Sequence, residues 1–199
     1  MTYYQEDRSF TNYVHDNIAV PKIYRTRGWE VQDTEVDQLE FIDLNHGIDY
    51  VLNDDRGHII NIQERFRDSY YQKYTDATLR YRRDKNPDPS RMKSEFYKIK
   101  ADYLVYGITN GKKFLDKRHT LTDFIKWVIL DVGFLKKKYQ NKELEIITTS
   151  SIFCKIQGKK LLCPENFNPD GSSSFVPIDI PMLNQLWGDK VIIAQKGYL

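Results

Sequence analysis

Two neighbouring segments of the sequence carry polar side chains where strands are expected to be apolar. The first is Gly-Ile-Asp, ending at Asp49, and the second is Gln-Glu-Arg at 63–65, with the turn-forming residues 53–57 between them. A hairpin of this length brings Asp49 close to Gln63 and Arg65, because residues i and i+2 of a strand share a face. One carboxylate, one amide oxygen and one fixed cation then converge, which is a minimal set for a divalent metal ion and a phosphodiester.

The order helix, strand, Gly-Ile-Asp strand, hairpin and Gln-Glu-Arg strand resembles the PD-(D/E)xK nuclease superfamily, the fold of restriction endonucleases and Holliday-junction resolvases. In that family an aspartate and an acidic residue two positions before a lysine bind magnesium, and the lysine positions the water or the scissile phosphate. The resemblance places Asp49 at the first position, Gln63 at the acidic position and Arg65 at the lysine, over roughly residues 7–108. Glutamine at the acidic position is a variant of Mrr-type restriction enzymes, whereas arginine at the lysine position is less usual.

These departures from the family pattern change the chemistry of the site. Mg²⁺ prefers oxygen ligands and keeps several waters, so Gln63 is a weaker ligand than the anionic Asp49. Arg65 cannot lose its proton and act as a general base, but it can clamp a phosphate with two hydrogen bonds. Oxygens of Asp49 and Gln63 more than about 7 Å apart would rule out a shared magnesium ion, whose ligands lie at ~2.1 Å.

Glu64 is a further candidate, although strand alternation directs it to the face opposite Gln63 and Arg65. It becomes a metal ligand if a bulge shifts the register. The catalytic candidates are therefore Asp49, Gln63, Glu64 and Arg65, and the candidate ligands of Mg²⁺ or Mn²⁺ are Asp49, Gln63 and Glu64. The sequence leaves open whether another acid comes from Glu6, Asp7, Glu40 or Asp43.

A basic region follows the motif. Residues 1–64 carry 13 acidic and 5 Lys or Arg side chains, whereas residues 65–100 carry 11 Lys or Arg and 5 acids. Basic side chains neutralise phosphates, and the tyrosines interleaved with them can stack on bases. We expect DNA as the partner, bound by Arg67, Lys73, Arg80, Arg82, Arg83, Lys98 and Lys100. An ordinary basic surface with buried tyrosines would give the same pattern.

The composition is that of a globular protein, with 199 residues, 14% aromatic and 29% charged. We expect one α+β (α/β) domain over 1–199, with a mixed central sheet flanked by helices and a restriction-endonuclease-like core at about 7–139. Residues 140–199 would complete the sheet or contact a partner. No apolar run approaches the ~18–20 residues of a membrane span, and no signal sequence is visible, so we expect a cytoplasmic protein without membrane contact. Cys154 and Cys163 are expected to be free thiols.

Local patterns predict the positions of the main elements. Apolar residues at 4-3-4-3 spacing, after a Thr120 and Asp123 capping pattern, indicate a helix over 122–139. Prolines predict loops at 86–90 and, with Gly and Ser, at 164–177. The other predicted helices are 7–19, which ends or restarts at Pro21, and 181–186. The predicted strands are 29–31, 48–52, 59–66, 78–83, 96–100, 101–108, 145–153, 160–163 and 191–194.

The sequence therefore favours a metal-dependent DNA endonuclease with a restriction, repair or mobile-element role. One alternative is a catalytically inactive protein of the same fold that binds DNA or serves in an assembly. A second alternative is an α+β protein-interaction module without a nucleic-acid function. The recognised DNA, and whether the protein acts as a homodimer, are left open by the sequence.

Overall fold

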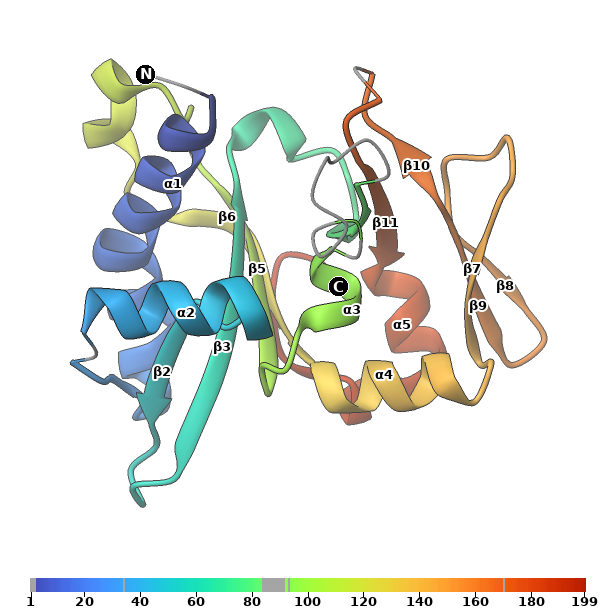
Figure 1. Ribbon diagram of the computed structural model, residues 1–199, viewed down its shortest axis with the longest axis horizontal. Helices are drawn as coiled ribbons and strands as arrows, with labels where there is room; N and C mark the ends of the chain where they lie inside the picture. Colours follow the sequence, from blue (N-terminus) through green and yellow to red (C-terminus); the bar gives the residue numbers. More distant parts are fainter. Residues whose placement is uncertain (1–2, 34, 84–91, 93, 170) are drawn as a thin grey trace.

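A six-stranded mixed sheet forms the centre of the structure, a computed structural model (Figure 1). The structure describes residues 3–33, 35–83, 92, 94–169 and 171–199. The predicted loop at 86–90 lies outside these residues. The strand order is β1-β2-β3-β5-β6-β12, in which β3 and β5 are parallel and all other neighbours are antiparallel. The strands are β1 (Glu30–Val31), β2 (Tyr50–Asn53), β3 (Ile59–Arg67), β5 (Tyr103–Thr109), β6 (Phe124–Asp131) and β12 (Ile192–Lys196).

A long N-terminal helical segment covers one face of this sheet. It consists of α1 (Tyr3–Val14), a π-helix η1 (His15–Tyr24) and a 3-10 turn η2 (Arg25–Arg27). Its apolar residues, including Val14, Ile18 and Ile23, are buried against Ile62 and Val105 of the sheet. The helical segment continues past Pro21, which we expected to end or restart it, because the π-helix runs on to Tyr24.

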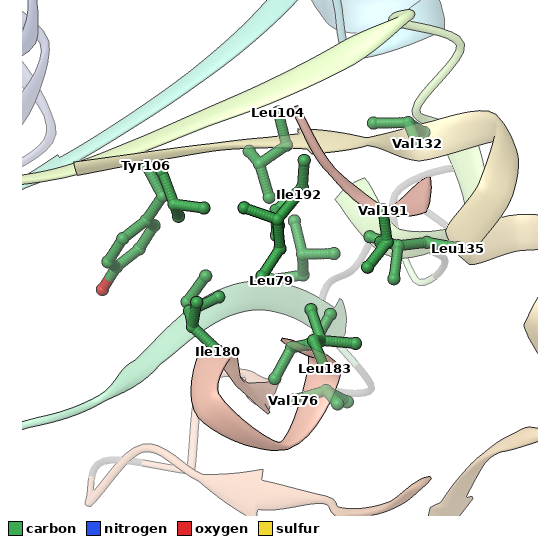
Figure 2. Packing of buried hydrophobic residues seen from close by; sticks show 14 of the residues in the cluster. Leu79, Leu104, Tyr106, Val132, Leu135, Val176, Ile180, Leu183, Val191 and Ile192 are labelled. Carbon is green, nitrogen blue, oxygen red and sulfur yellow. The ribbon is translucent and has the colours of Figure 1, made fainter. Parts of the chain in front are cut away.

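Two small sheets and two helices lie on the other side of the central sheet (Figure 1). One sheet has the order β10-β11-β4, and the other has the order β7-β9-β8. Figure 2 shows the shared core, in which Leu104 and Tyr106 of β5 meet Leu79, Val176 and Ile180. The elements are β4 (Asp76–Arg82), α4 (Val132–Gln140), β7 (Leu144–Ile147), β8 (Lys155–Gln157), β9 (Lys160–Pro164), β10 (Asn166–Phe167), β11 (Ser174–Asp179) and α5 (Ile180–Trp187).

Two further helices lie beside β3 and form walls of the candidate site. They are α2 (Val36–His46), which the sequence had left unassigned, and the single-turn α3 (Glu95–Lys98). The two are joined where the Lys100 N–H donates to the His46 carbonyl at 2.7 Å. The remaining 3-10 turns are η3 (Ser69–Tyr71), η5 (Leu115–Thr120) and η6 (Gly188–Lys190).

The predicted fold class is confirmed, since helices and a mixed central sheet build one α+β domain. Residues 140–199 contribute β12 to the edge of the central sheet, and β11 pairs with β4 along its length. In the described part of the chain no helix is both long and apolar enough to span a membrane.

The predicted helix over 122–139 is wrong in its first half. Residues 124–131 form strand β6, and α4 begins only at Val132, where the Asp131 carboxylate accepts from the Phe134 N–H at 2.7 Å. The strand is apolar on both sides because Val128 and Ile129 enter different cores. A strand buried on both faces gives a continuous apolar run, which also satisfies helical spacing.

Two other local predictions are wrong for a different reason. The predicted strand at 96–100 is replaced by α3, which packs Phe96 against Tyr139 of α4 at a centroid distance of 5.0 Å. The predicted loop at 164–177 contains β10 and most of β11. The partner of β11 is β4, almost one hundred residues earlier, and such distant pairing overrides local composition.

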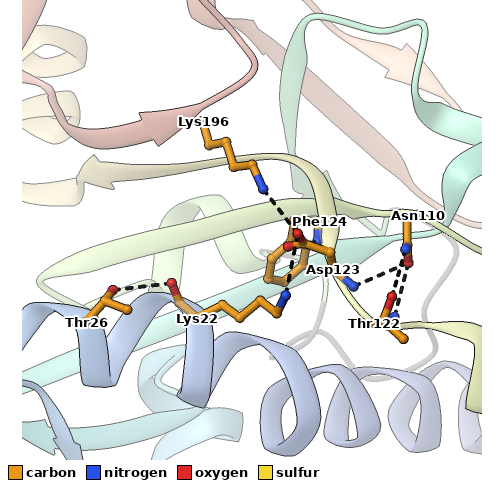
Figure 3. Close-up of polar contacts among 7 residues, drawn as sticks. All are labelled: Lys22, Thr26, Asn110, Thr122, Asp123, Phe124 and Lys196. Atoms are coloured by element: carbon orange, nitrogen blue, oxygen red, sulfur yellow. Dashed lines mark hydrogen bonds and ion pairs between the residues drawn. The ribbon is translucent and has the colours of Figure 1, made fainter.

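An ionic contact joins the N-terminal helical segment to the far end of the sheet (Figure 3). The Asp123 carboxylate, just before β6, lies 3.5 Å from Lys22 Nζ of the π-helix and accepts from Lys196 Nζ of β12 at 3.2 Å. The N–H groups of Thr122 and Asp123 donate to the Asn110 side chain, which lies just after β5. These contacts tie together three segments that are distant in sequence.

We predict that Leu104→Ala lowers the free energy of unfolding by about 2–5 kcal/mol, because a fully buried leucine leaves a cavity in the core that the central sheet shares with β4 and β11. Urea denaturation followed by circular dichroism measures this change. Ile125→Ala, at a residue 38% exposed, is the control and should cost less than about 1 kcal/mol. Equal losses in both variants would contradict the placement of the core.

Candidate active site

A cleft of about 640 Å³ opens along the edge of β3, and we call it the β3 cleft. Strand β2 pairs only with residues 59–62 of β3, so the edge of β3 beyond Ile62 faces the cleft. Helices α1, α2 and α3 and strand β4 supply the other walls. The four catalytic candidates from the sequence, Asp49, Gln63, Glu64 and Arg65, all line this cleft.

Asp49 lies immediately before β2 and closes the β2–β3 ladder. Its N–H donates to the Ile62 carbonyl at 2.8 Å, and its Oδ2 accepts from the Glu64 N–H at 2.7 Å. The same Oδ2 accepts from Gln63 Nε2 at 2.6 Å. Gly47 is required two residues earlier, because it has a φ of +55° and a Cβ there would lie 3.2 Å from Gln63 Oε1. The Gly-Ile-Asp pattern thus has a local structural cause.

The electrostatic environment of Asp49 opposes its ionisation. Burial raises its pKa well above the usual value, and the neighbouring carboxylate of Asp43 raises it further, as do Glu64 and Glu95. The hydrogen bond from the Glu64 N–H acts in the opposite direction but is outweighed. Several carboxylates therefore act on Asp49, and its protonated form is favoured.

Gln63 shares the cleft-facing side of β3 with Arg65 and contacts Asp49 directly. Its Oε1 is buried and has no hydrogen-bond partner among the described residues. Because Oε1 and Nε2 are bonded to the same carbon, Oε1 lies within about 5 Å of the Asp49 Oδ2. This distance lies below the ~7 Å at which a shared magnesium ion is ruled out, although the amide nitrogen, not Oε1, faces Asp49.

Glu64 lies on the opposite face of β3, as strand alternation requires. The pairing of β3 with β5 runs from Ile62 to Arg67 without a register shift, so no bulge turns Glu64 round. Its Oε1 accepts from the Tyr24 hydroxyl and lies 2.8 Å from His15 Nδ1, while its buried Oε2 has no partner in the described residues. Burial, and then the charge of Glu64, raise the pKa of Tyr24, so its hydroxyl stays protonated.

Arg65 points towards a residue that the sequence reasoning missed. Its Nη1 donates to Glu95 Oε2 of α3 at 2.9 Å. Burial lowers the pKa of Arg65 to about 10, so it remains a cation at neutral pH. Glu95 lines the β3 cleft, and its buried Oε1 has no partner within the part of the chain that the structure describes. Because a strand was predicted at 96–100, the sequence did not indicate Glu95 as a site residue. Ser94 followed by an acid is, however, a signal for the start of a helix.

The four further acids that the sequence left open as metal ligands lie in different places. Asp43 lines the cleft and pairs with Arg8 at 2.9 Å. Asp7 also lines it and pairs with Lys113 at 2.8 Å. The backbone carbonyl of Glu6 accepts from Arg118 at 3.3 Å, and the side chain of Glu40 lies outside the described residues.

Three of the seven expected DNA-binding residues, Arg80, Arg83 and Lys98, line the β3 cleft. Lys98 Nζ also donates to the Leu44 carbonyl at 2.9 Å. Arg82 instead forms two hydrogen bonds with Glu165, at 2.9 and 2.5 Å. Arg67 and Lys73 lie against tyrosine rings of the turn after β3, and Lys100 is exposed beyond α3.

The described residues include no group of three or more His, Cys, Asp or Glu side chains arranged to hold a metal ion. Mg²⁺, however, is commonly held by one or two carboxylates together with water and substrate phosphate. Asp49, Gln63 and Glu95 line the cleft and carry oxygens of the kind that Mg²⁺ prefers, whereas the Glu64 side chain points to the helix-covered face.

In comparisons with protein-family models, curated proteins and solved structures, no significant match to this chain was found.

We predict that Asp49→Asn stabilises the metal-free protein at neutral pH. Since the folded-state pKa of Asp49 is raised, the wild type loses stability as pH rises through the unfolded value, about 3.9, towards the folded value. Asparagine keeps an acceptor oxygen and avoids this loss. Urea unfolding in EDTA from about pH 4 to pH 8 should show a gain in the variant that grows with pH.

Asp54→Asn is the matched control with the opposite sign. Hydrogen bonds from the His58 N–H lower the pKa of Asp54, so its replacement should lower stability at neutral pH and have no effect well below the ordinary pKa. A gain of stability in Asp54→Asn, or none in Asp49→Asn, would contradict the charge environment described.

Proposed function

We propose that this protein is a metal-dependent nuclease that acts on DNA in the β3 cleft. The observation that carries the proposal is the contact between Asp49 and Gln63 at 2.6 Å, beside buried oxygens that have no donor among the described residues. The resemblance of the Asp49…Gln63-x-Arg65 pattern to PD-(D/E)xK nucleases supports the same activity.

In this proposal Asp49 and Gln63 hold the metal ion, Mg²⁺ or Mn²⁺. A bound Mg²⁺ would supply positive charge at a phosphoryl oxygen. The family pattern has an acidic residue where this chain has Gln63. Glu95 supplies the negative charge that is missing at that position. Glu95 lines the cleft, and its carboxylate accepts a proton from the attacking water.

Arg65 has a different role from the family lysine. Its hydrogen bond to Glu95 Oε2 fixes the carboxylate of α3 beside β3, so Arg65 positions Glu95. Arg80, Arg83 and Lys98 bring positive charge to the same cleft and favour a polyanionic substrate. Glu64 stabilises the floor of the site from the helix-covered face through His15 and Tyr24.

We predict that the protein cuts linear, nicked or branched DNA with Mg²⁺ or Mn²⁺, that EDTA stops the cutting, and that Asp49→Ala abolishes it. Glu95→Gln should slow the reaction roughly 10²–10⁴-fold, the usual worth of a proton acceptor. Gel assays under single-turnover conditions measure these rates, and Asp54→Ala on the β2–β3 turn is the matched aspartate control. Salt-sensitive binding without cutting would instead support an inactive DNA-binding protein of this type, and no binding at low salt would exclude both.

We also predict that Mn²⁺ at ten times its Kd stabilises the wild type by about 1.4 kcal/mol, raising the unfolding midpoint by roughly 3–5 °C. Asp49→Asn should remove this shift, because it replaces the anionic ligand, and Asp54→Asn should keep it. Differential scanning fluorimetry without DNA measures the effect. An equal shift in Asp49→Asn would place the cation elsewhere.

A further inference from the structure

Three tyrosines gather on the turn between β3 and β4, and we call Tyr70, Tyr71 and Tyr74 the tyrosine cluster. Tyr70 is 64% exposed and Tyr71 is 38% exposed, so their rings reach solvent. Ring centroids of Tyr70 and Tyr71 are 5.4 Å apart, and those of Tyr71 and Tyr74 are 6.2 Å apart. Tyr70 and Tyr71 meet edge to face at 79°, and Tyr71 and Tyr74 are tilted by 40°, so the three rings are close neighbours that present different faces.

Each ring of the tyrosine cluster has a cation against it. Lys112 Nζ lies 5.5 Å from the centroid of Tyr70, Arg67 Cζ 5.2 Å from that of Tyr71, and Lys73 Nζ 5.1 Å from that of Tyr74. A nucleotide presents a flat base and a phosphate only a few ångströms apart. Alternating aromatic and positive groups match that repeat, since bases stack on the rings while cations meet the phosphates.

The turn that carries the tyrosine cluster is anchored. The Asp68 carboxylate accepts from the Tyr70 N–H at 3.0 Å and from the Lys113 N–H at 3.3 Å. The Ser69 N–H donates to the Gly111 carbonyl at 2.9 Å. The exposed rings are thus held by a fixed backbone, which lowers the entropy lost when a base stacks on them.

The tyrosine cluster lies just past the end of β3, whose Arg65 lines the β3 cleft. Arg67, which lies against Tyr71, follows Arg65 by two residues on the same face of β3. Two residues of a strand span about 7 Å, close to the spacing of successive phosphates in an extended strand. A strand stacked on the cluster can therefore continue towards the residues of the cleft.

We propose that the tyrosine cluster binds an unpaired segment of DNA. In a duplex the base faces are already stacked on one another, so the rings select bases that are free to stack. A substrate that has a single-stranded segment beside the cutting site, such as a flap, gap or branch, follows from this. That last step rests on the proposed nuclease function, whereas strand binding by the cluster does not.

The experiment measures binding by fluorescence anisotropy in EDTA, in protein carrying Asp49→Ala so that no DNA is cut. The probes are labelled oligothymidine, oligouridine of the same length, and a duplex of the same length. Tyr70→Leu and Tyr71→Leu remove single rings, and Tyr70→Phe keeps the ring. Phe153→Leu removes a ring that is 68% exposed before β8 and is the matched control.

We expect each leucine substitution in the cluster to weaken oligothymidine binding about fivefold or more, which is the loss of one stacked base, and to leave duplex binding unchanged. Tyr70→Phe and Phe153→Leu should bind like the parent protein. The proposal is overturned if oligothymidine binding is unchanged, if the duplex loses as much, if Phe153→Leu has the same effect, or if oligouridine binds more tightly than oligothymidine. If the wild-type protein, which keeps Asp49, binds DNA but does not cut it with metal, the nuclease proposal is removed and this one is retained.

Discussion

The carboxylate of Asp49 occupies the place that the next residue pair of the β2–β3 ladder would take. By accepting from the Glu64 N–H at 2.7 Å, it satisfies a backbone donor that the end of β2 leaves without a strand partner. The chain before β2 can then turn away into Gly47 and α2, and the edge of β3 opens into a cleft. The same oxygen holds Gln63, so the interaction that ends the ladder also builds the site.

The contacts of Asp49 bring several carboxylates together, and neighbouring arginines neutralise only some of them. Asp49, Glu64, Glu95 and Asp43 approach one another in a buried region, and the raised pKa of Asp49 is the consequence. Arg65 offsets one of these charges through Glu95, and Arg8 offsets another through Asp43. Because buried carboxylates repel one another at low effective dielectric, the protonated form of Asp49 is favoured there. Structure and proposed chemistry thus have a common electrostatic origin.

The sequence predicted those parts of the site that depend on local register. The Asp49 and Gln63 contact follows from one hairpin, and the opposite orientation of Glu64 follows from strand alternation. Glu95 could not be found in this way, because its position depends on α3 folding back onto β3 and on packing of Phe96 against α4. The same limit explains the wrong helix at 122–139 and the missed β11: β6 is buried on both faces, and β11 is formed by its pairing with β4.

The two faces of β3 give Glu64 a role that its place in the motif does not suggest. Its Oε1 receives the Tyr24 hydroxyl and contacts His15, which stacks on Tyr50 of β2 at a centroid distance of 3.5 Å. His15 is the first residue of the π-helix, a widened helical form that occurs often at functional sites. Glu64 thus links the N-terminal helical segment to the edge of the cleft, because its side chain contacts His15 and Tyr24 while its N–H donates to Asp49 Oδ2.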